Sequence, residues 1–89
     1  MSQHLLMIED DARLAAMVGE YLEQNGFTVS KAPDGLSGLG RLNQGGDNHA
    51  PELVILDLML PDIDGLEVCR RVRALPTTMA QIPILMLTA

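Results

Sequence analysis

Residues 53–57 read Leu-Val-Ile-Leu-Asp, which is four apolar residues in a row followed by a carboxylate. Two other stretches also have four apolar residues followed by a polar one: residues 5–9 read Leu-Leu-Met-Ile-Glu, and residues 84–88 read Ile-Leu-Met-Leu-Thr. Uninterrupted apolar runs of this length are typical of parallel strands that are covered on both faces. We therefore expect three buried strands, each ending at a polar residue.

Between these runs, apolar residues recur at the spacing of a helix. A first helix is indicated by residues that share one face: Leu14, Met17, Val18, Tyr21 and Leu22. Leu36, Leu39 and Leu42 suggest a second helix, although Gly35, Gly38 and Gly40 weaken it by roughly 1 kcal/mol each relative to Ala. Asp64 can cap a third helix, whose apolar face contains Val68, Val72 and Leu75. Residues 27–31 alternate between apolar and polar types, as expected for an edge strand.

The order β-α-β-α-β-α-β predicts an α/β fold, a doubly wound parallel sheet with helices on both faces. Eighty-nine residues allow one small domain, spanning 1–89. The chain ends at Ala89, directly after a strand that reads as buried. Because a buried strand needs neighbours, we expect that further elements of the domain are missing.

Acidic residues follow the expected strands. Glu9, Asp10 and Asp11 follow the apolar run at residues 5–8, and Asp57 follows the apolar run at residues 53–56. In open parallel sheets ligands bind beyond the carboxyl ends of the strands. Carboxylates about 4–5 Å apart repel by roughly 3–4 kcal/mol at an effective dielectric of 20, and a hard cation such as Mg²⁺ relieves that repulsion. Taken alone, residues 9–11 are more simply explained as a helix cap and first turn.

Composition narrows the choice of function. The net charge of −6, from 12 acidic and 6 basic residues, argues against contact with nucleic acid by this segment. Cys69 is the only cysteine, which excludes an internal disulfide and favours a reduced, cytoplasmic setting. No stretch has the pattern of a signal peptide or approaches the length of a membrane span.

Residues 53–65, Leu-Val-Ile-Leu-Asp-Leu-Met-Leu-Pro-Asp-Ile-Asp-Gly, closely resemble the phosphoacceptor segment of two-component response-regulator receiver domains. Residues 5–11 resemble the first strand and acidic pair of this CheY-like family, and residues 85–89 its fourth strand with the switch hydroxyl. The resemblance covers essentially the whole chain and implies strand order 2-1-3-4. The longer protein to which this segment would belong resembles transcription regulators of the OmpR/PhoB type, which carry a winged-helix DNA-binding domain.

The resemblance implies a role for each matching residue. Asp57 is the expected phosphoacceptor, and a sensor histidine kinase is the expected partner. Glu9, Asp10, Asp57 and the backbone carbonyl of Met59 are the expected Mg²⁺ ligands. Thr88 is expected to hydrogen-bond the phosphoryl group.

One departure from the family is clear: the fifth strand, with its Lys and aromatic residue, and the last helices have no counterpart in these 89 residues. The resulting alternative is a truncated fragment that keeps the acidic site, is inactive in phosphotransfer and only self-associates through the edge of the strand at residues 84–87. An aspartyl phosphohydrolase would carry a second Asp at position 59, which is Met here. A nucleotide or flavin binder would need a Gly-rich loop after the first strand.

Overall fold

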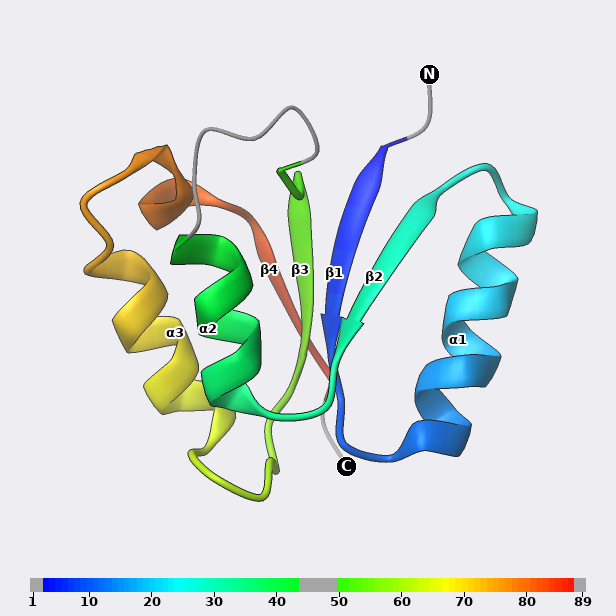
Figure 1. The fold of residues 1–89 in the computed structure, drawn as a ribbon, viewed down its shortest axis with the longest axis horizontal. Coiled ribbons are helices and arrows are strands. Elements are labelled where there is room, and N and C mark those ends of the chain that lie inside the picture. Colours follow the sequence, from blue (N-terminus) through cyan, green and yellow to red (C-terminus); the bar gives the residue numbers. More distant parts are fainter. Residues whose placement is uncertain (1–2, 44–49, 88–89) are drawn as a thin grey trace.

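The computed structural model describes residues 3–43 and 50–87. Its strands are β1 (His4–Ile8), β2 (Thr28–Ala32), β3 (Leu53–Asp57) and β4 (Ile84–Leu87). Its helices are α1 (Ala12–Gln24), α2 (Gly35–Asn43) and α3 (Gly65–Arg73), with a short 3-10 helix, η1, at Thr78–Gln81. All strand pairings are parallel, as the apolar runs predict, and the order is β2-β1-β3-β4, as the family resemblance implies (Figure 1).

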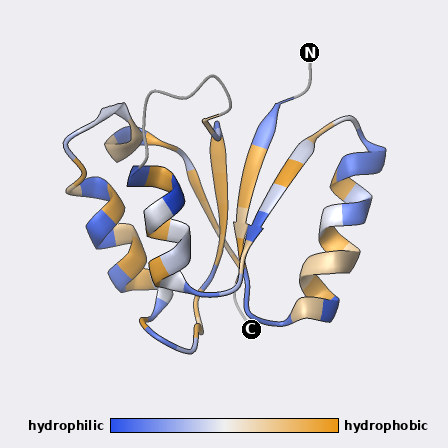
Figure 2. Ribbon diagram, viewed as in Figure 1, coloured by the Kyte–Doolittle hydropathy of each residue, from blue (hydrophilic) through white to orange (hydrophobic). Residues whose placement is uncertain are grey.

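The sheet separates two apolar clusters, because successive strand residues point to opposite faces. The larger cluster lies under α2 and α3 and includes Leu6, Ile8, Val54 and Leu56, each at most 1% exposed. The smaller one lies under α1 and includes Leu5, Met7 and Ile55. Figure 2 shows β3, β4 and most of β1 as hydrophobic, β2 as mixed, and helices in which hydrophobic and hydrophilic residues are interspersed. Two helices thus cover one face and a single helix covers the other (Figure 1).

Two helix faces differ from the expectation. Met17 and Tyr21 of α1 are 63% and 65% exposed, because the buried side of this helix is centred on Ala15 and Gly19. Small residues let α1 approach the sheet closely, which leaves larger neighbours on its flank. In α2 the buried residues are Gly35, Gly38 and Leu42, while Leu36 is exposed. These buried glycines are therefore packing residues and not only weak points of the helix.

Each of the helices α1, α2 and α3 begins at the carboxyl edge of the sheet and has a carboxylate at its N-terminus (Figure 1). Asp11 accepts hydrogen bonds from the backbone N–H groups of Arg13 and Leu14. Asp34 accepts from the N–H of Ser37, and Asp64 from the N–H of Glu67. Such caps satisfy N–H groups that have no partner within the helix. The expected cap at Asp64 is confirmed, and Asp11 is the residue of 9–11 that supplies the cap expected there.

No helix in residues 3–43 and 50–87 is long and apolar enough to cross a membrane.

Candidate functional site

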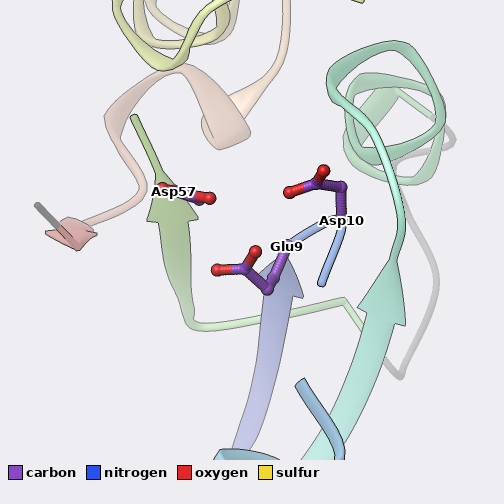
Figure 3. Close-up of side chains that lie close together, drawn as sticks. All are labelled: Glu9, Asp10 and Asp57. Atoms are coloured by element: carbon purple, nitrogen blue, oxygen red, sulfur yellow. The ribbon is translucent and has the colours of Figure 1, made fainter. Parts of the chain in front are cut away.

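Glu9, Asp10 and Asp57 lie together at the carboxyl edge of the sheet. One carboxylate oxygen from each lies within 4.8 Å of the others. Glu9 and Asp10 follow β1 and Asp57 ends β3, and these strands are neighbours in the sheet. Figure 3 shows the three side chains pointing toward one another. The convergence that the strand ends predicted is therefore present.

The backbone holds Glu9 in place. Its N–H donates to the carbonyl oxygen of Ala32 at 3.0 Å, which continues the β1–β2 pairing by one residue. Its Oε2 accepts from the N–H of Asp11 at 3.0 Å. The residue is only 5% exposed. A side chain held in this way stays inside the cluster instead of turning out to water.

Asp57 is positioned by the turn that follows β3. The N–H of Met59 donates to Asp57 Oδ1 at 3.3 Å. The N–H of Gly65 donates to the carbonyl oxygen of Leu58 at 2.8 Å, which closes the loop between β3 and α3. A Cβ on Gly65 would lie 2.6 Å from the carbonyl oxygen of Asp57, so only glycine permits this approach. The loop is thereby closed tightly beside the carboxylate.

The cluster is electrostatically unfavourable without a cation. Burial raises the pKa of the Glu9 carboxyl above its usual value, and the charge of Asp57 raises it further. Within the described part of the chain, both ion pairs found involve Glu67 and none involves the cluster. Oxygen-only ligands at this spacing suit Mg²⁺ better than Zn²⁺ or Cu²⁺. The donor set therefore fits a hard divalent cation.

The helix-cap explanation of residues 9–11 holds for one residue. Asp11 is the N-cap of α1, whereas Glu9 and Asp10 belong to the cluster. Met59 is 69% exposed and its N–H donates to Asp57 Oδ1, but the role of its carbonyl oxygen stays a prediction. Thr88 lies outside the described residues, so its role also stays a prediction.

Asp62 is a feature that sequence reasoning missed. Its carboxylate accepts hydrogen bonds from the N–H groups of Gly35 and Leu36 at 2.9 and 2.8 Å. These bonds lower the pKa of the Asp62 carboxyl. The partners are 26 and 27 positions away in the chain, so no local pattern could have indicated the contact.

Comparisons with known proteins agree with this arrangement. Among curated relatives, the chain is 44% identical over 85 residues to the DNA-binding dual master transcriptional regulator RpaA of Synechocystis sp., covering 96% of this chain and 33% of RpaA. It is 40% identical over 86 residues to the transcriptional regulatory protein CseB of Streptomyces coelicolor, covering 97% and 33%. The chain thus spans about a third of the length of these relatives.

Solved structures show the same fold. The phosphorylated cyanobacterial phytochrome response regulator RcpA superposes with a TM-score of 0.85 at 28% identity, covering 99% of this chain and 66% of that one. A CheY-like receiver domain from Methylobacillus flagellatus gives 0.84 at 28% identity, covering 99% and 70%. The response regulator receiver domain family matches residues 5–89. With the sheet order, the acidic edge and this match in agreement, the chain belongs to the response regulator receiver domain family.

Proposed function

We propose that this chain is a phosphoacceptor module that takes a phosphoryl group onto Asp57 from a sensor histidine kinase. The observation that carries the proposal is the placement of Asp57 beside Glu9 and Asp10 at the carboxyl edge of the sheet. A phosphorylated form of RcpA, which has the same fold, supports it. The role is that of a signalling module and not of an enzyme with its own turnover.

In the proposed reaction a carboxylate oxygen of Asp57 forms a bond to phosphorus while the bond between phosphorus and the histidine nitrogen of the donor breaks. The product is an aspartyl phosphate, and the histidine ring takes up a proton. The hydrogen bond from the N–H of Met59 to Oδ1 orients the carboxylate. It leaves Oδ2 as the candidate nucleophilic atom.

Mg²⁺ is the proposed cofactor. Glu9, Asp10, Asp57 and the carbonyl oxygen of Met59 are its proposed ligands, and the ion would supply charge neutralisation for the phosphoryl oxygens. The fit of the donor set supports this assignment, since three carboxylates meet within 4.8 Å. Thr88 is the proposed hydroxyl partner of the phosphoryl group.

The proposed output is control of transcription by a DNA-binding region of a longer parent protein, acting in the cytoplasm. RpaA and CseB are transcriptional regulators about three times as long as the matched region, which supports this assignment. Since the acidic surface disfavours DNA, the described segment itself would signal to that region and would not touch nucleic acid.

The first experiment is phosphorylation by a small acyl phosphate with Mg²⁺, followed by intact mass. We expect an added phosphoryl group that requires Mg²⁺ and is absent from Asp57→Asn. Glu67→Gln is the matched control, because it removes a carboxylate outside the cluster. A folded wild-type chain that gains no mass would contradict the proposal.

A second candidate function is self-association without phosphotransfer, and one observation favours it. β4 is an edge strand of the described sheet. Its Leu85 is in register with Ile55, so it lies on the face that α1 covers, and it is 55% exposed. Edge strands present unpaired backbone groups that can pair with another chain. A second copy of this chain, joined edge to edge at β4, would bury both Leu85 side chains.

Sedimentation velocity tests this candidate. Leu85→Lys should shift a dimer toward monomer, because a charged residue at an edge strand opposes pairing. Leu66→Lys is the matched control, since Leu66 is 65% exposed on α3. A wild-type chain that stays monomeric up to high concentration would rule out self-association.

A further inference from the structure

We infer that Asp62 is a positioning residue for the acidic site, holding the loop after Asp57 against the start of α2. The inference rests on the proposed function, because it concerns how the same site is kept in shape. Asp62 is exposed, lies outside the cluster and contributes no oxygen to it. Its effect would pass through the loop that it anchors.

The hydrogen bonds of Asp62 connect two segments that meet only by folding. Oδ1 accepts from the N–H of Gly35 and Oδ2 from the N–H of Leu36, so both carboxylate oxygens bind α2. Asp34 already caps this helix through Ser37. The helix therefore has a carboxylate of its own, and Asp62 adds a link to the loop.

Packing beside Asp62 is equally close. A Cβ built on Gly35 would lie 2.7 Å from Ile63 and 2.8 Å from Val68. Ile63 follows Asp62 in the loop and packs against the larger apolar cluster. The first residue of α2 thus rests directly on the loop, and its lack of a side chain makes the two hydrogen bonds possible.

These contacts complete a connection between the two sides of the acidic site. On one side Glu9 is bonded through its N–H to Ala32 at the end of β2, three residues before Gly35. On the other side Asp57 leads into the loop that Gly65 closes through the carbonyl oxygen of Leu58. Asp62 joins Gly35 to that loop. The position of the Met59 backbone relative to Glu9 is set by this connection.

The test compares Asp62→Ala with Asp34→Ala, which removes a cap from the same helix without touching the loop. In metal-free buffer, we expect the Gly65 and Met59 amides of Asp62→Ala to exchange hydrogen about tenfold faster than in the wild type, the effect of losing a charge-assisted anchor. Asp34→Ala should speed exchange at Ser37 and leave Gly65 unchanged.

A second readout separates positioning from simple loss of stability. With an acyl phosphate donor, the Mg²⁺ concentration at half-maximal rate should rise about tenfold in Asp62→Ala, the usual cost of losing a residue that orients metal ligands. The rate at saturating Mg²⁺ should change much less. Asp34→Ala should match the wild type in both quantities. If Asp62→Ala does not fold, Asp62→Asn, which keeps one acceptor oxygen, should show intermediate shifts.

The inference is overturned if Asp62 and Asp34 variants show the same Gly65 exchange. It is also overturned if phosphorylation occurs and the Asp62 variants leave the Mg²⁺ midpoint unchanged. A wild-type chain that is never phosphorylated would defeat the proposed function, while the exchange measurement would still decide the role of Asp62.

Discussion

Glu67 and the acidic cluster have opposite electrostatic surroundings in this small domain. Glu67 on α3 lies between Arg70 and Arg71, with Arg71 Nε 2.7 Å from its Oε2, and hydrogen bonds from the two arginines lower the pKa of the Glu67 carboxyl to about 2. Glu9, only 5% exposed, faces two further carboxylates, and burial raises its pKa. One carboxylate has its counter-charges within the chain, and the other has none in the described segments.

The difference distinguishes a carboxylate that stabilises a helix from carboxylates that could bind a cation. Glu67 is neutralised by arginines one turn away along α3, at positions i+3 and i+4. A group of carboxylates left without such partners favours a cation from solution. Clustering of acidic residues alone would not distinguish the two cases, whereas the pKa directions do.

The largest expected effect concerns the cation. Replacing both Glu9 and Asp10 with their amides should weaken Mg²⁺ binding by at least about a hundredfold, because two anionic ligands are lost. Mg²⁺ titration calorimetry on the folded variants measures this. Glu67→Gln, the control that removes a carboxylate outside the cluster, should bind Mg²⁺ as the wild type does. Equal weakening in both variants would mean that the ion is held only by the overall negative charge.

The next effect is on stability without metal. Glu9→Gln should increase the free energy of unfolding at pH 7 by roughly 1–3 kcal/mol, since it removes a buried charge that repels neighbours within 4.8 Å. Because the folded pKa of Glu9 is raised, the folded state binds more protons than the unfolded state above pH 4.5. Wild-type stability should therefore fall as pH rises through this region, and less so in Glu9→Gln. Urea unfolding across this pH range measures both, and an unchanged or lower stability of Glu9→Gln would contradict the repulsion.

The smallest effect is expected at Glu67. Its folded pKa is lowered from 4.5 to about 2, so its contribution is present above pH 4.5 and is lost as pH falls toward 2. Glu67→Gln should therefore lower stability slightly at neutral pH, and this effect should disappear as the pH falls through about 2. Since Arg70 and Arg71 are 68% and 43% exposed, salt should screen the difference. Urea unfolding at low and high salt measures it, and an effect larger than that of Glu9→Gln would reverse the comparison.

Most of the architecture could be predicted from the sequence, because it depends on short-range patterns. Three apolar runs ending at Glu9, Asp57 and Thr88 were enough to predict parallel strands and an acidic edge. The strand order came from the resemblance and is confirmed. The convergence of Glu9, Asp10 and Asp57 followed from the rule that parallel strands end at one edge.

Other features depend on contacts between distant segments, which local patterns do not encode. Asp62 binds α2 across 26 and 27 positions, and it reads as an ordinary loop residue. Gly35 reads as a weak helix residue, yet it is the point where α2 touches Ile63. Tyr21 reads as a core residue of α1, but the helix turns its small residues to the sheet.

The helix caps have a consequence for reaction rates. Asp11, Asp34, Asp62 and Asp64 serve helix N-termini, yet they lie at the same sheet edge as Glu9, Asp10 and Asp57. These four carboxylates, none of which belongs to the cluster, thus add to a negative field in front of the site, which attracts cations and repels small anions. Divalent ions would arrive faster at low ionic strength, whereas small anionic phosphodonors would be slowed. The same field would favour a donor that brings its own positive surface, which a protein can do and a small acyl phosphate cannot.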